Sequence, residues 1–307
     1  LNSIVMNFKD KTAIVTGSSM GIGKAIARHL AQAGANVVLN GRNETRLERT
    51  LSDFAGEGLA VSACSGDVSN TRDCRKLIAH AVKKYGGIDI LVNNVGIGYK
   101  GCFEETSPDV FRQMLGTNVL SSIYPTLEAL PHIRVRRGSI VFISSLAGLR
   151  GMPFKSIYSL TKMAQTSLAE SLRYELRKEG VHIGIVYVST TKNDPGKVLL
   201  LPDGTLGAVA KNKGVFIDTK DDAAMATLKN IKYRQFKTPV GIKGKAYYFM
   251  QQYMPWFVDL NFRLFRNYIA KKSGATQLIS SEPTHANGAQ KGLADVTINR
   301  GKAALFH

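Results

Sequence analysis

Short apolar runs alternate with longer segments of helical periodicity through the first two thirds of the chain. A run of about four to eight apolar residues is typical of a strand buried on both faces, whereas apolar residues that recur every three or four positions indicate an amphipathic helix. The runs predict strands at residues 11–16, 36–39, 59–63, 88–92, 139–143 and 181–188. The segments between them predict helices over residues 24–33, 44–54, 71–85, 107–130 and 156–179. This alternation predicts an α/β fold, a doubly wound parallel sheet of about seven strands with helices on both faces.

The first predicted strand ends in a glycine-rich turn, and a helix follows directly. The turn reads Gly17-Ser18-Ser19-Met20-Gly21-Ile22-Gly23. Because glycine has no Cβ, the backbone N–H groups of such a turn can approach a diphosphate at the N-terminus of the helix. Glycines also occur in ordinary turns, but the flanking strand and helix favour a dinucleotide site. The expected cofactor contacts come from Gly17, Ser19, Gly21, Ile22 and Gly23.

The end of the second strand predicts which dinucleotide binds. An acidic residue there would bind the ribose 2′-hydroxyl of NAD, whereas an arginine accommodates the 2′-phosphate of NADP. The chain reads Asn40-Gly41-Arg42 at this point, so we expect NADP(H) rather than NAD(H), with Arg42 as the phosphate partner. The alternative is that Arg42 is an exposed residue of the next helix. Asp67, after the third strand, is expected to accept a hydrogen bond from the adenine amino group, or to act in the turn before the following helix.

Tyr158 and Lys162 are the main candidates for acid–base chemistry. On one helix, their spacing of four residues places the phenol and the ammonium group side by side. A free phenol titrates near pH 10 and is a poor proton donor at neutral pH until a fixed cation stabilises the phenolate. Two other Tyr–Lys pairs share this spacing, but only this one follows a buried strand that ends in a hydroxyl side chain, Ser145.

With Asn118, a polar residue in an otherwise apolar helix, these features resemble the short-chain dehydrogenase/reductase family over about residues 8–190. The resemblance rests on Thr16-Gly-Ser-Ser-Met-Gly-Ile-Gly23, Asp67, Asn93-Asn94-Val95-Gly96, Asn118, Ser145 and Tyr158-Ser-Leu-Thr-Lys162. It implies a Rossmann fold and a catalytic tetrad. In that family the counterpart of Ser145 binds the substrate carbonyl and that of Tyr158 is the general acid. The counterpart of Lys162 binds the nicotinamide ribose and lowers the pKa of the tyrosine, and that of Asn118 holds a water in the proton relay.

The resemblance also implies cofactor contacts by Asn94, Gly96, Tyr158 and Lys162, and this chain departs from the family pattern at two places. Val95 replaces the usual alanine, which adds a little volume beside the cofactor. The Pro-Gly that normally follows the sixth strand and contacts the nicotinamide is replaced by Val188-Ser189. Thr190 is then the expected source of a hydroxyl on the nicotinamide side.

The composition of the chain bears on its partners, its metal content and its cellular compartment. The chain has 307 residues and a formal net charge of +18, which favours anionic partners such as phosphates, a nucleic acid or a membrane surface. Its three cysteines lack metal or redox spacing and its six histidines are scattered, so we expect no metal and a reducing cytoplasm. The first residues lack a cationic segment followed by an apolar one, so we expect no signal peptide, with Met6 as a candidate native start. No apolar run reaches transmembrane length.

The elements expected in the C-terminal third of the chain indicate what kind of substrate the protein binds. We expect a substrate-covering loop over residues 192–216, a helix over 218–231, and an amphipathic helix over 255–270 that forms a helical extension of the same domain. From Thr227 to Lys272 there are ten Lys or Arg and one acid, Asp259. An aromatic face flanked by basic residues is typical of a helix at a membrane interface, and packing on the core or on a second subunit is the alternative. Residues 273–307 are expected to form a flexible tail.

These observations lead to one leading hypothesis and two alternatives. We expect an NADPH-dependent oxidoreductase that reduces a ketone, or oxidises the matching secondary alcohol, on an apolar lipid-like or steroid-like substrate. The alternative enzyme reduces 3-oxoacyl groups on an acyl carrier protein. The alternative of another class is a non-catalytic NADP-binding regulator, which would have no use for a complete tetrad. The family resemblance implies a homodimer or homotetramer, and we expect no specific nucleic acid.

Overall fold

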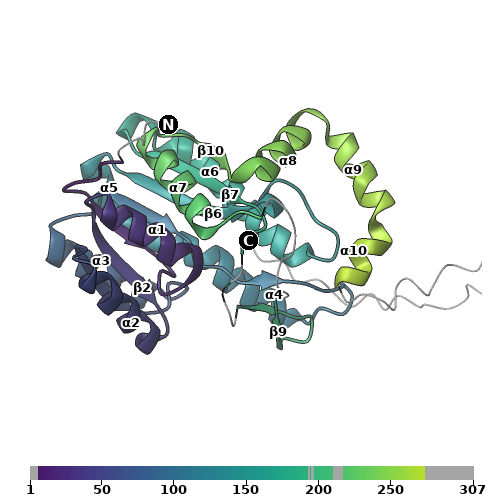
Figure 1. The fold of residues 1–307 in the computed structure, drawn as a ribbon, viewed down its shortest axis with the longest axis horizontal. Coiled ribbons are helices and arrows are strands. Elements are labelled where there is room, and N and C mark those ends of the chain that lie inside the picture. The colour runs from purple at the N-terminus through teal and green to yellow at the C-terminus, as the bar shows by residue number, and fades with distance from the viewer. Residues whose placement is uncertain (1–5, 193, 195–196, 210–216, 274–307) are drawn as a thin grey trace, which may run out of the picture.

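The computed structural model describes residues 6–192, 194, 197–209 and 217–273. Its centre is a parallel sheet of seven strands in the order β10-β7-β6-β4-β1-β2-β3 (Figure 1). The strands are β1 (Thr12–Val15), β2 (Asn36–Gly41), β3 (Val61–Ser65), β4 (Ile90–Asn93), β6 (Ser139–Ser145), β7 (His182–Val188) and β10 (Lys237–Pro239). The predicted doubly wound parallel sheet is therefore confirmed. The strand β10 was not among the six expected runs and completes the seven.

Helices cover both faces of this sheet because successive strand residues point to opposite sides. In β1, Val15 packs with helices α1 (Gly21–Gln32), α2 (Glu44–Gly56) and α7 (Lys220–Lys232). Its neighbour Ile14 packs with α3 (Thr71–Tyr85), α5 (Ser121–Arg136) and α6 (Ser156–Glu175). Both side chains are fully buried, which is why the strands read as continuous apolar runs.

The helix expected over residues 107–130 is interrupted. It begins as α4 (Pro108–Leu115), capped by Ser107, and passes through a π-helical turn, Gly116–Leu120, before α5. A π-helical turn has one residue more than an α-helical turn. Such turns are a known cause of helix bending and often lie at functional sites. Asn118 lies within this π-helical turn. Short 3₁₀ turns, Leu146–Gly148 and Arg177–Glu179, follow β6 and α6.

The segment 192–216, expected to be a substrate-covering loop, contains short strands in the part that the structure describes. Strands β8 (Val198–Leu200) and β9 (Leu206–Ala208) form an antiparallel pair, and β8 also pairs in parallel with β5 (Gly98–Tyr99). This small sheet lies beside α4 (Figure 1). Strands of two or three residues are too short to give a periodic signal in the sequence.

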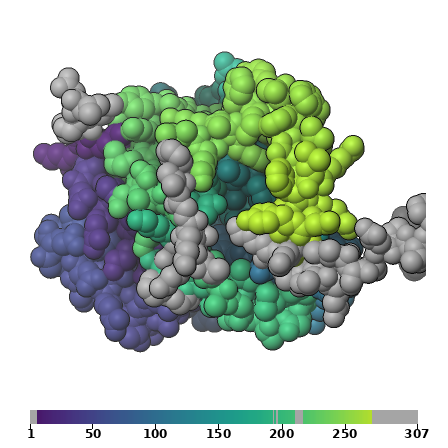
Figure 2. Space-filling view, turned by 45° about the vertical axis from the view of Figure 1, so that its right-hand side comes forward, coloured from purple at the N-terminus to yellow at the C-terminus, as the bar shows by residue number. Residues whose placement is uncertain are grey.

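The last helices leave the sheet and form a C-terminal arm, residues 241–273. The arm contains α8 (Gly241–Tyr253), α9 (Pro255–Leu264) and α10 (Arg266–Ser273). The single helix expected over 255–270 is thus broken at Phe265, and α8 was not expected. Figure 2 shows α8 and the yellow α9 and α10 framing a hollow in the surface. The expected flexible tail lies beyond Ser273, outside the described residues. Among the described residues, no helix is long and apolar enough to cross a bilayer.

The arm is attached to the core at both ends. Near its start, Tyr248 in α8 packs on Tyr187 of β7, with ring centroids 6.2 Å apart. Arg150, in the loop after β6, donates a hydrogen bond to Gln251 at 3.2 Å and forms an ion pair with Asp259 in α9. At the far end, Ala270 is buried against Cys102 and Phe154. The arm therefore arches over the segment between Ser145 and Tyr158.

Candidate active site at the carboxyl edge of the sheet

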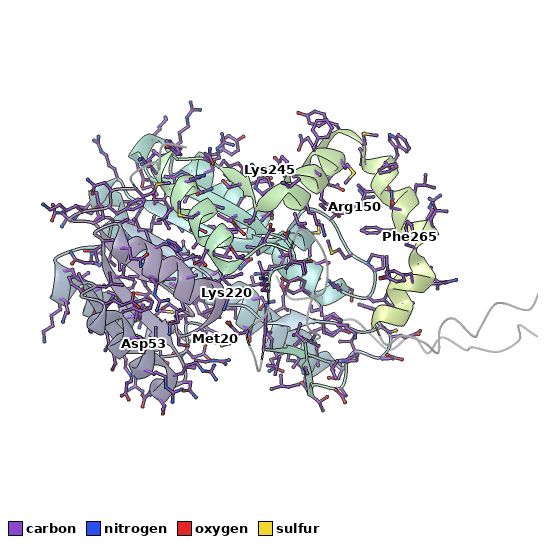
Figure 3. The ribbon with its side chains drawn as sticks, viewed as in Figure 1. Met20, Asp53, Arg150, Lys220, Lys245 and Phe265 are labelled. Carbon is purple, nitrogen blue, oxygen red and sulfur yellow. The ribbon has the colours of Figure 1, made fainter. Side chains whose placement is uncertain are left out.

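The predicted site residues gather where the parallel strands end. The glycine-rich turn follows β1, Arg42 follows β2, Asp67 follows β3, Asn94 follows β4, Ser145 ends β6, and Thr190 follows β7. Met20 of the turn and Lys220 of α7 lie along this edge in Figure 3. The topology brings residues that are far apart in sequence to one edge, as it does for ligand sites in other open α/β sheets.

The glycine-rich turn requires its glycines for two different reasons. Gly17 and Gly21 have φ angles of +63° and +62°, which residues with a Cβ rarely adopt. Gly23 is needed for close packing, since a Cβ there would lie 2.4 Å from the carbonyl oxygen of Gly17. Asn94 braces the turn by donating hydrogen bonds to the carbonyls of Thr16 at 3.0 Å and Gly17 at 3.2 Å. Asn94 thus holds the shape of the turn.

The N-terminus of α1 fits a diphosphate group. Helices α2, α3 and α7 are capped by the side chains of Asn43, Asn70 and Thr219. At α1 the cap position is Met20, and no side chain among the described residues caps the helix there. The first N–H groups of a helix need an acceptor, and an anion supplies one. The uncapped helix end and the close-packed glycine turn together accommodate a dinucleotide phosphate.

Arg42 and Asp67 lie beside this turn and contact each other. The guanidinium of Arg42 is exposed and lies 3.3 Å from a carboxylate oxygen of Asp67. Burial alone would raise the pKa of Asp67, but hydrogen bonds from Ser69 and the charge of Arg42 lower it below its ordinary value. The cap of α3 is Asn70, so Asp67 serves the preceding turn rather than the cap. Arg46, which the sequence did not single out, donates to the sulfur of Met20 at 3.1 Å and adds a second cation here.

Asp194 and Lys220 also lie at this edge and were missed. Asp194 forms an ion pair with Lys220, the first residue of α7. A Cβ added to Gly21 would lie 3.5 Å from a carboxylate oxygen of Asp194. A negative charge therefore sits beside the turn that fits a phosphate. Contacts of this kind depend on how the chain returns to the sheet edge and leave no signal in the sequence.

Ser145 and Tyr158, two of the predicted tetrad residues, lie close to each other. Tyr158 lies in α6, and the hydroxyl of Ser145, which ends β6, is near enough to the phenol to affect its pKa. Burial raises the pKa of Tyr158 above its ordinary value, and the nearby hydroxyl of Ser145 opposes the rise. The expected lowering of this pKa by Lys162 is wrong for this structure, because the ammonium nitrogen lies 6.0 Å from the centre of the phenol ring and has other partners.

Lys162 is buried and held by two acceptors. Its Nζ donates to the carbonyl oxygen of Ile143 at 3.0 Å and to Oε1 of Gln165 at 3.1 Å. Only 5% of the residue is exposed, and burial lowers its pKa to about 8. A Cβ at Gly96 would lie 3.3 Å from the ammonium nitrogen, so the missing side chain at Gly96 leaves space on that side of Lys162.

Asn118 is fully buried and acts on the backbone, as the sequence suggested. Its Oδ1 accepts from the N–H of Ile97 at 2.7 Å, and its Nδ2 donates to the carbonyl of Ile97 at 3.0 Å and to Thr161 at 3.1 Å. The side chain thereby ties the π-helical turn to the chain after β4 and to α6. Its own carbonyl accepts from Gln165 at 3.0 Å.

The region that replaces the usual Pro-Gly is held by Asp218. Ser189 donates a hydrogen bond to the Asp218 carboxylate, and the Asp218 N–H donates to the carbonyl of Thr190 at 3.2 Å. Asp218 therefore precedes the helix, which begins at Lys220, rather than lying in its first turn as expected. Thr190 itself is exposed at the sheet edge.

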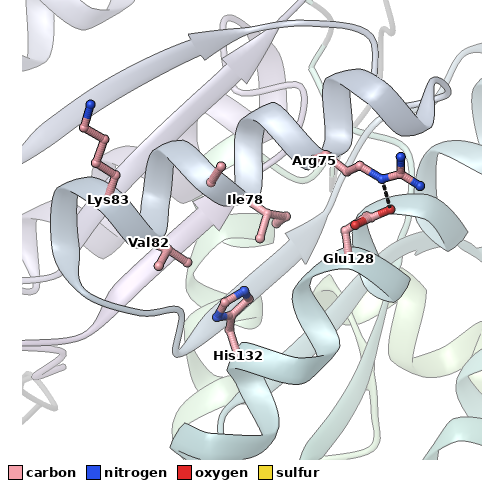
Figure 4. Close-up of a pocket in the computed structure, with 7 residues that line it drawn as sticks. Arg75, Ile78, Val82, Lys83, Glu128 and His132 are labelled. Atoms are coloured by element: carbon pink, nitrogen blue, oxygen red, sulfur yellow. Dashed lines mark hydrogen bonds and ion pairs between the residues drawn. The ribbon is translucent and has the colours of Figure 1, made fainter.

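The surface pocket in Figure 4 is separate from this site. It has a volume of about 430 Å³ and lies between α3 and α5, lined by Ile78, Val82 and His132 among others. Arg75 and Glu128 form an ion pair, 3.1 Å long, at its rim. Neither the glycine-rich turn nor the tetrad contributes to it. Within the described ranges, no group of three His, Cys, Asp or Glu side chains is placed to hold a metal ion.

A parallel doubly wound sheet with a close-packed glycine-rich turn at its carboxyl edge is the architecture of the dinucleotide-binding α/β class. The chain belongs to the short chain dehydrogenase family, whose model matches residues 11–198.

Named relatives agree with this assignment. The chain is 40% identical over 175 residues to an 11-beta-hydroxysteroid dehydrogenase of Pinus massoniana, covering 55% of this chain and 48% of that protein. It is 33% identical over 190 residues to dehydrogenase/reductase SDR family member 2, mitochondrial, of Homo sapiens, covering 62% of this chain and 68% of that protein. The aligned part thus spans about half of the pine protein's length and two thirds of the human one.

Solved structures show the same fold with cofactor bound. A short chain dehydrogenase/reductase from Burkholderia phymatum, in complex with NAD, has a TM-score of 0.67 at 25% identity and covers 75% of this chain and 89% of that chain. L-sorbose reductase from Gluconobacter frateurii, complexed with NADPH and L-sorbose, has a TM-score of 0.59 at 27% identity and covers 61% and 72%.

Proposed function

We propose that this protein is an NADPH-dependent carbonyl reductase that acts on an apolar ketone, or on the matching secondary alcohol in the reverse direction. The observation that carries the proposal is the gathering of the Ser145 hydroxyl, the Tyr158 phenol and the buried Lys162 ammonium group at the end of β6. The solved relatives that hold NAD or NADPH support a nicotinamide cofactor. When bound, that cofactor supplies the hydride.

The protein's own side chains stabilise and protonate the carbonyl oxygen of the substrate. As a ketone is reduced, negative charge develops on its oxygen, and hydroxyl donors aimed at that oxygen stabilise the charge. Ser145 and Tyr158 are the two donors. Tyr158 then delivers its proton, a general-acid step worth roughly 10²- to 10⁴-fold in rate. Burial raises the pKa of Tyr158, which keeps the phenol protonated at neutral pH but makes it a weaker acid, so the proton passes only to the strongly basic alkoxide that forms as the ketone is reduced.

The surroundings of Tyr158 support an apolar substrate. Tyr158 packs against a buried cluster formed by Tyr99, Val110, Met114, Ile157 and Leu200. The cluster joins β5, α4, α6 and β8, so the small sheet covers one side of the reacting groups. The side of Tyr158 that faces this cluster is therefore apolar, which favours apolar ketones over sugars or charged acids. The hydroxysteroid dehydrogenase name of the pine relative agrees with this substrate class.

Arg42 supports NADPH over NADH. Arg42 is exposed directly after β2. The preceding residue, Gly41, packs against the glycine-rich turn, since a Cβ on Gly41 would lie 3.0 Å from the Oγ of Ser19. Arg42→Glu is expected to lower kcat/KM with NADPH at least tenfold, because a carboxylate would repel the 2′-phosphate. With NADH the change should be small. Equal losses with both cofactors would contradict the assignment.

The direct test is NADPH oxidation with steroid, fatty-acyl, quinone and small ketone panels. Tyr158→Phe removes the proton donor but keeps the ring, so turnover is expected to fall at least a hundredfold while NADPH still binds. Tyr233→Phe, which changes an exposed tyrosine outside the site, serves as the matched control. Wild-type turnover by the Tyr158→Phe variant would refute the role. Activity only with carrier-bound 3-oxoacyl substrates, falling with salt, would favour the alternative enzyme.

We further propose that the exposed apolar side chains of the C-terminal arm bind an anionic membrane surface. Large apolar side chains are exposed there instead of packing on the core: Ile242, Phe249, Tyr253, Trp256, Leu260, Leu264, Phe265 and Tyr268. Trp256 is 62% exposed and Leu264 70%. Lys243, Lys245, Arg263 and Arg266 are exposed among them. Aromatic side chains flanked by cations suit the boundary between acyl chains and anionic headgroups.

Vesicle binding tests this surface. Sedimentation with phosphatidylserine vesicles should carry down the wild-type protein, and Trp256→Ser combined with Leu264→Ser should reduce the bound fraction several-fold. The control is Leu206→Ser on β9, which removes an equally exposed apolar side chain elsewhere. No difference between the variants and the wild type would contradict the proposal. A loss of dimer in the arm variant would instead assign this surface to a second copy.

A homodimer or homotetramer is proposed to form through α5 and α6. Leu127 and Val135 on α5 and Leu160 and Met163 on α6 are exposed apolar residues, with Val135 83% exposed. Burying such side chains between two copies is favourable. Light scattering of Leu160→Glu should show a smaller species than the wild type, and an unchanged mass would argue against this interface.

A further inference from the structure

Gln165 lies one helical turn after Lys162 and shares its buried environment. Only 1% of Gln165 is exposed. Its Oε1 accepts from the ammonium group of Lys162 at 3.1 Å. Its Nε2 donates to the main-chain carbonyl of Asn118 at 3.0 Å and to Oγ of Ser122 at 2.8 Å. The amide therefore uses its acceptor and both its donors at once.

The chemistry of these neighbours fixes which way the amide points. Turning it over would place an NH₂ group against the ammonium of Lys162 and an oxygen against the carbonyl of Asn118. Both contacts would be repulsive and would leave buried groups without partners. Ser122 also donates to the carbonyl of Asn118, at 3.4 Å, which leaves its oxygen able to accept from Gln165. The network is consistent only with the oxygen of Gln165 on Lys162.

The carbonyl of Asn118 thus has two side-chain donors of its own. In the family, the counterpart of this asparagine holds a water that connects to the lysine. Here the amide of Gln165 spans the same two groups, the carbonyl of Asn118 and the ammonium of Lys162, by direct hydrogen bonds. A side-chain amide is a fixed link, whereas a water molecule can reorient and pass on a proton.

We propose that Gln165 is a positioning residue of the reductase reaction, whose amide links the Lys162 ammonium directly to the main-chain carbonyl of Asn118 in place of a relay water. The proposal rests on the proposed carbonyl reductase function. Lys162 has three N–H donors, and the structure gives two of them to Ile143 and Gln165. The third is left for the cofactor ribose on the side of Gly96, where no Cβ obstructs it.

This link has a consequence for the charge of Lys162. A neutral acceptor within hydrogen-bond distance favours the ammonium form over the amine. Removing that acceptor should shift the titration of Lys162 downward by about one pH unit, the size expected for losing a hydrogen bond to a charged group. A residue with a merely structural role would change stability but would not move this titration.

The test compares three variants. Gln165→Met keeps the volume and loses all three hydrogen bonds, Gln165→Glu restores an acceptor for Lys162, and Thr166→Val removes buried hydrogen bonds of the next residue without touching the ammonium group. NMR of lysine-labelled, cofactor-free protein follows Lys162, which is assigned with Lys162→Met. Thermal unfolding shows that each variant is folded.

The titration midpoint of Lys162 should fall by about one pH unit in Gln165→Met, return upward in Gln165→Glu and stay unchanged in Thr166→Val. The upper pH limit of kcat with the best ketone should move with it, which lowers turnover at pH 8 about fivefold while KM changes little. An unchanged midpoint in both Gln165 variants would overturn the proposal. If Gln165→Met does not fold, a midpoint in Gln165→Glu that is no higher than in the wild type overturns it, because a carboxylate that accepts from the ammonium group should hold the proton more tightly than the amide does. Because the NMR readout needs no substrate, its result is independent of the proposed function.

Discussion

Burial of Lys162 should make the stability of the cofactor-free protein depend on pH in a predictable way. The pKa of Lys162 falls from 10.5 to about 8 on folding because the surroundings exclude water. The unfolded chain therefore binds the proton more tightly than the folded chain. Stability contributed by this group is present at high pH and is lost as the pH falls toward the folded pKa.

The size of the effect follows from the two pKa values. Each pKa unit corresponds to about 1.4 kcal/mol, so charging buried Lys162 costs roughly 3 kcal/mol at pH 7. At pH 9.5 the folded chain is already neutral at this position and the remaining cost is about 1.4 kcal/mol. The free energy of unfolding of the wild type should thus rise by about 2 kcal/mol relative to a variant without the amine.

Lys162→Met supplies the comparison. Urea unfolding of both proteins at pH 7 and pH 9.5 gives two differences in unfolding free energy, and their change between the two pH values isolates Lys162. Other buried groups that titrate here, such as Cys74, whose pKa burial raises to about 12, cancel because they are common to both proteins. A difference that does not change with pH would refute the assignment of a depressed pKa and, with it, the view that Lys162 loses its proton more readily in the folded protein than in the unfolded chain.

Three further predictions concern other parts of the structure. Gly23→Ala places a Cβ 2.4 Å from the carbonyl of Gly17, so we expect at least tenfold weaker NADPH binding by fluorescence titration and roughly 1–3 kcal/mol lower stability. Burial lowers the pKa of His182 from 6.5 to about 4. As the pH falls from 7 to 4, the wild type should therefore lose about 3 kcal/mol of unfolding free energy relative to His182→Gln, and urea unfolding of both proteins measures this difference. Asp194→Asn removes a negative charge beside the glycine-rich turn, and calorimetry should show roughly fivefold tighter NADPH binding; unchanged or weaker binding would mean that Asp194 does not oppose the phosphates.

The sheet could be predicted from the sequence because its strands are buried on both faces. The run ending at Val188 has every residue buried in β7, so burial itself makes the strand visible as an apolar run. The helix α3 was predicted with the bounds that it has, since Asn70 caps its start and Gly86, with a φ of +76°, ends it. Local chemistry and packing agree at these places, which is why reasoning from sequence succeeds there.

The groups around the active site were only partly predictable. Tyr158, Lys162 and Ser145 have a recognisable spacing, but Gln165 reads in sequence as one more polar residue on a helix. Its role depends on the π-helical turn, which turns the carbonyl of Asn118 toward α6. The pKa of Tyr158 was predicted in the wrong direction for the same reason. Spacing places Lys162 near the phenol, but the acceptors at Ile143 and Gln165 hold its ammonium group 6.0 Å from the ring centre.

The cofactor side and the substrate side of this protein are built from different kinds of sequence. The glycine-rich turn and the tetrad follow the family pattern, whereas Ser189, Asp218 and the C-terminal arm depart from it. Yet the arm is attached to residues inside the family-like core, by Arg150 between Ser145 and Tyr158 and by Tyr187 of β7. A ligand or membrane that moves the arm therefore acts on the loop that joins Ser145 to the helix of Tyr158, while the turn that fits the diphosphate follows another strand, β1. Changes in the arm should accordingly alter the KM for a ketone more than the affinity for NADPH.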